Sequence, residues 1–225
     1  MEIEPMSAIL RKSKMFSGLS GEEIELLLSR FGADIRSYSK GETMLRSGIM
    51  LKKFGMLVSG RAEIVHEDFW GNRTLISELL PGQLFAEAFA FSECVKTYVT
   101  VVAEKDCTAL WLDADRVTDV EMTSCAHITV LKNMLSDFVE KTLTVNEKIR
   151  HMSKRTTRQK LMSYLSSVAE KRGADEFDIP LDRSRLADYL AVDRSAMTTE
   201  LSRLKRDGVI DFSGRHFRLL RKNTF

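Results

Sequence analysis

The spacing of apolar and polar residues changes along the chain and predicts distinct segments. Residues 8–31 have helical spacing, and Ser20-Gly21-Glu22-Glu23 has the composition of a helix N-cap. From residue 33 to 112, short β-forming runs alternate with glycines, as is typical of an antiparallel sandwich or barrel. Gly71-Asn72 predicts a hairpin turn, because both residues tolerate positive φ. The predicted strands are Ile35–Tyr38, Thr43–Arg46, Phe54–Val58, Ala62–His66, Thr74–Glu78, Val99–Val102 and Thr108–Leu112.

Residues 113–152 contain neither glycine nor proline, and their apolar positions repeat as in a coiled coil. A seam this narrow favours pairing between two copies of the chain, with Thr142 as its weak point. The alternative is a long helix that packs against its own barrel. The seam positions, spaced alternately three and four residues apart, are Ile128, Leu131, Leu135, Phe138, Thr142, Val145, Ile149 and Met152.

Beyond residue 153 the pattern becomes one of short helices. Residues 156–172 predict a helix that ends at Gly173. Asp182 or Ser184 can cap a helix through Leu190, and residues 194–206 predict another that ends at Gly208. Only three residues join these last two helices, which is typical of a helix-turn-helix. Residues 209–220, with Ser213-Gly214 at the turn, then predict a β-hairpin wing.

The second helix of this pair has an exposed polar face suited to DNA. Arg is the side chain best matched to guanine, while Ser and Thr can address several bases. Residues 150–225 hold 17 Lys and Arg against 10 Asp and Glu, a net charge of +7, whereas residues 1–149 hold 17 against 22, a net charge of −5. The basic C-terminal part therefore favours a polyanionic partner, double-stranded DNA. The predicted DNA-binding residues are Arg194, Ser195, Thr198, Thr199, Ser202 and Arg203.

Composition excludes several other classes of protein. Hydrophobic residues make up 44% and charged residues 29% of the chain, as in soluble globular proteins. The acidic N-terminus has no apolar run, and no segment approaches the ~18 apolar residues of a membrane span, so we expect neither a signal peptide nor a membrane location. Three widely spaced cysteines favour a reducing cytoplasm over a disulfide framework.

The order of barrel, long helix and winged helix-turn-helix resembles the cyclic-AMP receptor protein / fumarate-nitrate reduction regulator (Crp/Fnr) family over nearly the whole chain. The most specific stretches are residues 186–197 and 200–210. The resemblance implies an α+β fold: an N-terminal antiparallel double-stranded β-helix, a jelly roll like cyclic-nucleotide-binding domains, at residues 1–125. A dimerisation helix at 126–152 and a winged helix-turn-helix at 153–225 follow.

The resemblance further implies a homodimeric transcription regulator that binds a palindromic operator, with RNA polymerase as a candidate partner. The family's base-reading positions fall on Arg194, Ser195 and Thr199. Family members often have Glu and Arg at the latter two positions. The target sequence of this chain is therefore expected to differ from theirs.

An effector site is implied at residues 82–97, where nucleotide-binding family members have Phe-Gly-Glu and then Arg-Ser/Thr. This chain keeps Glu87 and Thr97, but Ala86 replaces the glycine and Lys96 stands near the expected arginine, although Lys cannot replace Arg in bidentate phosphate binding. The segment is also rich in aromatic residues. We therefore favour a less polar small-molecule effector over cyclic AMP, which stays an alternative. The candidate residues are Phe85, Ala86, Glu87, Phe89, Phe91, Lys96 and Thr97.

The sequence gives little support for a metal site, a haem site or an enzyme. The cysteines lack the N-terminal clustering of an iron–sulfur site, and the histidines lack metal-ligand spacing, so no metal and no resident cofactor are expected. Ala86 and Ala88 stand where haem-type sensors have Cys and His. No P-loop, nucleophile elbow or metal-binding helix motif predicts an enzyme. The competing function is a cyclic-nucleotide-binding module that regulates a partner protein, which the basic helix-turn-helix disfavours.

Overall fold

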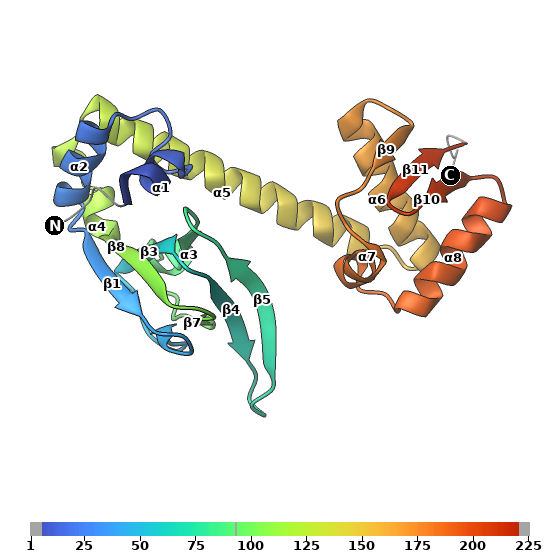
Figure 1. The fold of residues 1–225 in the computed structure, drawn as a ribbon, viewed down its shortest axis with the longest axis horizontal. Coiled ribbons are helices and arrows are strands. Elements are labelled where there is room, and N and C mark those ends of the chain that lie inside the picture. The colour runs from blue at the N-terminus through green and yellow to red at the C-terminus, as the bar shows by residue number, and fades with distance from the viewer. Residues whose placement is uncertain (1–5, 93, 221–225) are drawn as a thin grey trace. The chain divides into compact units, whose positions relative to one another are not determined.

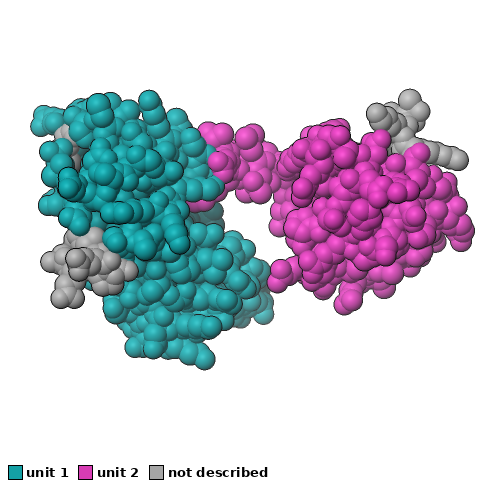
Figure 2. All heavy atoms as spheres, turned by 45° about the horizontal axis from the view of Figure 1, so that its top comes forward, with its two compact units in different colours: residues 1–138 teal, residues 139–225 magenta. Residues whose placement is uncertain are grey.

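The chain folds into two compact units in the computed structural model, which describes residues 6–92 and 94–220 (Figure 1). Unit 1 spans Met1–Phe138 and unit 2 spans Val139–Phe225 (Figure 2). The boundary falls inside the long helix α5, Cys125–Met152. Within the described residues, no helix is long and apolar enough to cross a membrane.

Unit 1 is built on antiparallel strands, and its described strands form two sheets of four. One sheet has the order β1-β8-β3-β6 and the other β2-β7-β4-β5. The strands are β1 Asp34–Tyr38, β2 Thr43–Leu45, β3 Lys53–Ser59, β4 Ala62–Glu67, β5 Arg73–Leu79, β6 Leu84–Phe85, β7 Thr100–Ala103 and β8 Cys107–Asp113. The helices are α1 Ser7–Lys12, α2 Gly21–Arg30, α3 Glu87–Ala90 and α4 Ala114–Val117, with a 3₁₀ turn at Val120–Met122 before α5.

Unit 1 has two apolar cores, and alternate residues of β3 point into one or the other. Phe54 and Met56 on one face pack with α1, α2, α4 and the start of α5. Leu57, on the other face, packs between the sheets with Trp111 and Tyr38. The Trp111 indole N–H donates to the Tyr38 hydroxyl at 2.9 Å, which satisfies the polar ends of both rings inside the core.

Most predicted strands are found within a residue or two of the expected bounds, but the predicted helix at 8–31 is wrong. Two helices occupy this stretch, because Ser13 caps the end of α1 and Gly18 takes a φ of +84°. Ser20 then starts α2: it accepts from the Glu23 amide, while the Glu23 carboxylate accepts from the Ser20 amide. The predicted hairpin is confirmed, although its loop runs from Asp68 to Asn72.

Unit 2 is a winged helix domain. The sheet order is β10-β11-β9, antiparallel throughout, with helices α6, α7 and α8 packed around one apolar core. The elements are α6 Thr157–Arg172, β9 Glu176–Asp178, α7 Arg183–Leu190, α8 Arg194–Arg206, β10 Ile210–Ser213 and β11 His216–Leu219. The α+β fold class is confirmed. The third strand, β9, was not predicted.

Helix α5 carries apolar side chains on two of its faces. Val130 and Met134 are buried in the first core of unit 1, so part of the helix does pack on its own domain. A broad strip of other apolar side chains remains exposed, with Leu143 and Val145 toward its opposite edges: Ile128, Leu131, Leu135, Val139, Leu143, Val145 and Ile149. The alternative of packing against its own barrel therefore holds for the N-terminal part of the helix, while pairing between two copies stays a prediction.

Candidate nucleic-acid interface

An aspartate N-cap begins each of the two helices of the helix-turn-helix. Asp182 accepts from the Arg185 amide at 2.9 Å and starts α7, and Asp193 accepts from the Ala196 amide at 2.8 Å and starts α8. Between the helices, Ala191 takes left-handed angles, φ 48° and ψ 61°, which costs an alanine about 1 kcal/mol. Met197, Leu201 and Leu204 are buried against α6 and α7, which leaves the opposite face of α8 in solvent.

All six predicted DNA-binding side chains lie on that exposed face of α8. Three of their hydroxyls donate close to the helix itself: Ser195 to Asp193 at 2.6 Å, Thr198 to the Arg194 carbonyl at 2.8 Å and Ser202 to the Thr198 carbonyl at 3.0 Å. Their oxygens can therefore accept from a DNA base more readily than they can donate. Arg194 and Thr199 have no side-chain partner among the described residues. Arg203 instead pairs with Glu200 at 3.5 Å.

The wing is anchored by a residue that sequence reasoning missed. Arg183 lies over the rings of Phe212 and Phe217, with its guanidinium carbon 4.6 and 5.0 Å from the ring centroids. Its Nη2 also donates to the Gly214 carbonyl in the wing turn at 3.1 Å. The first turn of α7 therefore holds the wing in place. An arginine beside a DNA-reading motif resembles a phosphate contact in sequence, and only the fold reveals that its partners are rings.

The predicted effector residues divide into distinct environments. Phe85 and Phe91 belong to cores, because Phe85 packs 5.1 Å from Trp111 and Phe91 5.2 Å from Phe54, measured between ring centroids. Thr97 is buried, and its hydroxyl already donates to the Arg46 carbonyl and accepts from the Ile49 amide. The Thr97 hydroxyl is therefore already engaged by the backbone of the neighbouring loop.

The remaining effector candidates lie around helix α3. Ala86 keeps a left-handed conformation, φ 63°, at the position where nucleotide-binding relatives have glycine, so the backbone turn survives the substitution. Glu87 follows it and is buried, whereas Lys96 is exposed. Phe89 packs edge-on against the exposed ring of Tyr98, with centroids 5.0 Å apart. An accessible pair of aromatic rings and an exposed lysine therefore lie near α3.

Comparison with known proteins gives two family matches. A family model described as a cyclic nucleotide-binding domain matches residues 35–124, and one described as a Crp-like helix-turn-helix domain matches residues 159–224. A curated relative, the transcriptional activator protein FnrL of Cereibacter sphaeroides, is 27% identical over 191 residues, which are 80% of this chain and 73% of the relative.

The chain belongs to the Crp/Fnr family of transcription regulators. This Crp/Fnr regulator is a DNA-binding protein, and the helix-turn-helix match decides against the alternative of a module that acts only on a partner protein.

Solved structures share the fold of this Crp/Fnr regulator. The catabolite activator protein of Thermus thermophilus has a TM-score of 0.50 at 20% identity, over 92% of this chain and 93% of that one. The c-di-GMP-responsive regulator CLP of Xanthomonas campestris has a TM-score of 0.52 at 17% identity, over 90% and 100%. OCPA-complexed CprK has a TM-score of 0.59 at 16% identity, over 88% and 92%.

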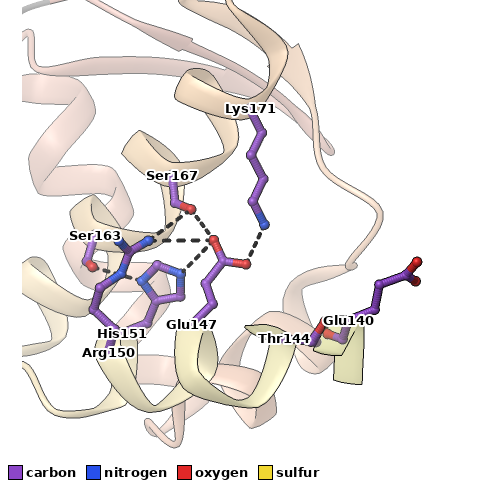
Figure 3. A network of polar contacts seen from close by, with 8 residues as sticks. All are labelled: Glu140, Thr144, Glu147, Arg150, His151, Ser163, Ser167 and Lys171. Carbon is purple, nitrogen blue, oxygen red and sulfur yellow. Dashed lines mark hydrogen bonds and ion pairs between the residues drawn. The ribbon is translucent and has the colours of Figure 1, made fainter. Parts of the chain in front are cut away.

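A polar junction joins the last turns of α5 to α6 and was not predicted from the sequence (Figure 3). Its centre is Glu147, whose carboxylate accepts from Ser167 and Lys171 of α6. These two hydrogen bonds, from Lys171 above all, hold the pKa of Glu147 below its usual range. Nothing local in the sequence signals this junction, because Glu147 and Lys171 are 24 residues apart.

His151 completes the junction on its buried side. Its Nδ1 lies 2.8 Å from the Ser163 hydroxyl, and Tyr164 of α6 and Tyr189 of α7 flank its ring. Burial lowers the pKa of His151, and the nearby Arg150, Lys171 and Lys154 lower it further against the opposing effect of Glu147. In the wing, hydrogen bonds to Glu176 and Asp178 raise the pKa of His216.

These two histidines predict opposite effects of acid on the stability of unit 2. As pH falls through the unfolded value of 6.5, the unfolded chain takes up the His151 proton first, so His151 costs stability in acid. The folded chain takes up the His216 proton first, so His216 adds stability in acid that is lost as pH rises through its raised pKa. Urea unfolding at pH values of about 7.5 and 5.5 measures both effects. We expect His151→Gln to reduce the acid-induced loss of stability and His216→Gln to increase it; changes of the same sign would contradict this assignment.

Proposed function

We propose that this regulator binds a palindromic operator as a homodimer, and that a small molecule held by its N-terminal domain controls the binding. The exposed polar face of α8 carries the proposal. Arg194 lies at the first position of that helix, where side chains of recognition helices reach base edges. Arg203, more than two turns further on, is better placed for a phosphate. We further propose that residues 1–125 sense the effector, 126–152 dimerise and 153–225 bind DNA.

The exposed strip of apolar residues on α5 supports a dimer. Leu135 and Leu143 are 64% and 62% exposed in the single chain, and the strip extends over the length of the helix. A second copy related by two-fold symmetry would cover it. Phe138, the seam residue of the sequence pattern, is half-buried and faces Phe91 in its own domain, with ring centroids 6.4 Å apart. Val139, also exposed, continues the strip in its place.

The ring pair Phe89–Tyr98 supports an effector of low polarity. Thr97 has its hydroxyl in use, and Lys96 offers an ammonium rather than a guanidinium. We propose the effector by its chemical class, a small, partly aromatic or apolar molecule. Family membership leads us to propose RNA polymerase as a further protein partner. The free thiols Cys94, Cys107 and Cys125 support a cytoplasmic location.

The dimer is tested by placing a charge on the exposed strip. Leu135→Asp should convert the dimer into monomers, because a carboxylate would be buried without a partner, and light scattering at micromolar concentration would detect it. Ser136→Asp introduces the same charge at the next residue, off the strip, and should leave the dimer intact. An unsubstituted protein that is monomeric in this experiment would overturn the proposed assembly.

The effector class is tested by calorimetry with cyclic AMP and cyclic GMP. We expect neither to bind more tightly than about 1 mM, because Lys96 stands in place of an arginine and the Thr97 hydroxyl already donates to the Arg46 carbonyl. Mass spectrometry of small molecules that co-purify with the native protein should then identify a ligand whose binding is lost in Phe89→Ala. Micromolar binding of cyclic AMP that disappears in Lys96→Ala would reverse the proposal.

Two substitutions in α8 distinguish side chains that contact bases from those that contact phosphates. Arg194→Ala should cost about 1–3 kcal/mol per half-site and relax the preference at one base pair, because it removes the paired donors that fit guanine. Arg203→Ala should weaken binding to all sequences and lower the slope of affinity against salt by about one per half-site. Selection from randomised operators tests both. The same recovered motif and affinity in each variant would remove α8 as the reading element.

A further inference from the structure

The last turns of α5 contact α6 through a polar junction centred on Glu147, and this junction has a consequence for DNA recognition. We propose that Glu147 is a positioning residue that sets the half-site spacing which the regulator accepts. The proposal rests on the dimer described above. Glu147 lies on α5, and its side chain is 19% exposed. Both of its oxygens are in use, since Oε1 accepts from Ser167 and Oε2 accepts from Lys171.

The partners of Glu147 approach from two helices (Figure 3). Ser167 and Lys171 come from α6, while Arg150 of α5 lies 3.6 Å from Oε1 and also donates to the Ser167 hydroxyl at 3.3 Å. His151 lies 3.8 Å from the same oxygen. Hydrogen bonds to an ionised group are directional and strong, so this set permits one relative rotation of the two helices where apolar contact alone would permit several.

Helix α6 in turn contacts the recognition helix α8. Arg158 of α6 bonds to Glu200 of α8 at 3.3 Å and to Asp207, just beyond α8, at 3.0 Å. Leu161 and Leu165 of α6 share a core with Met197 and Leu201 of α8. The recognition helix is therefore fixed to α6, and α6 is fixed to α5 at Glu147.

The C-terminal half of the proposed seam belongs to the same compact unit as the recognition helix. Val139, Leu143, Val145 and Ile149 all lie in unit 2 and are exposed. In a two-fold dimer the seam fixes the symmetry axis, so the angle between α5 and α6 sets the separation of the two recognition helices. Half-sites one base pair too close or too far are rotated by roughly a tenth of a turn, and a stiff junction cannot follow them.

Operators that differ only in spacer length test this role. Each would carry the same two half-sites, with the preferred spacer and with spacers one and two base pairs shorter or longer. The unsubstituted protein should favour one spacer. Glu147→Gln should reduce this preference by roughly tenfold, the effect of losing one charge-assisted hydrogen bond, while the half-site motif recovered by selection stays unchanged. Glu140→Gln makes the same chemical change on α5 away from the junction (Figure 3) and should keep the preference.

The possible results distinguish a failure of the dimer model from a failure of the role proposed for Glu147. If the unsubstituted protein is monomeric or binds all spacers alike, the dimer model fails. If it is a dimer that selects a spacer and Glu147→Gln selects it as sharply, the positioning role is wrong. Equal weakening at every spacer would show a merely structural role and also overturn it. Should Glu147→Gln fail to fold, Lys171→Met removes the bond from the α6 side, and an unchanged spacer preference in that variant would contradict the proposal.

Discussion

Helix α5 has two apolar faces, and its own chain covers only one of them. The barrel side of the helix buries Val130 and Met134 completely or nearly so, while side chains such as Leu135 and Leu143 stay largely in water. Leaving a leucine exposed rather than buried costs roughly 1.5–3 kcal/mol, and several such residues follow one another along this helix. In the proposed dimer, this cost would drive the association of two chains, and the spacing of the two DNA-reading helices would depend on that association.

The N-terminal domain has the architecture of a cyclic-nucleotide-binding domain, with several different residues at the expected effector site. The backbone turn at Ala86 is retained in a conformation that favours glycine, while the threonine hydroxyl is bonded to the neighbouring loop. Phe91, at the end of α3, lies between Phe54 of the barrel and Phe138 of α5. A ligand that moves α3 would therefore act on an aromatic ring that already contacts α5.

How far the sequence predicts this structure depends on whether a feature is local. The strands of the barrel, the Asp182 cap of α7 and the polar face of α8 follow from periodicity and from residues only a few positions apart. Strand β6 was not predicted because its two residues are too few to show alternating apolar and polar positions. Strand β9 was not predicted because its partner β11 lies about forty residues further along the chain. The direction of Phe138 depends on Phe91, and the role of Glu147 on Ser167 and Lys171 in the next helix. Such partners are brought together only by the fold.

In the proposed dimer, two copies of this chain read DNA together through α8. Hydroxyl-radical footprinting on a fragment obtained by selection tests it most directly, because the pattern reports symmetry and spacing in one measurement. The proposed dimer predicts two protected patches related by a two-fold axis, on one face of the duplex and about one helical turn, ~34 Å, apart from centre to centre. A single asymmetric patch, or patches on opposite faces of the DNA, would contradict it.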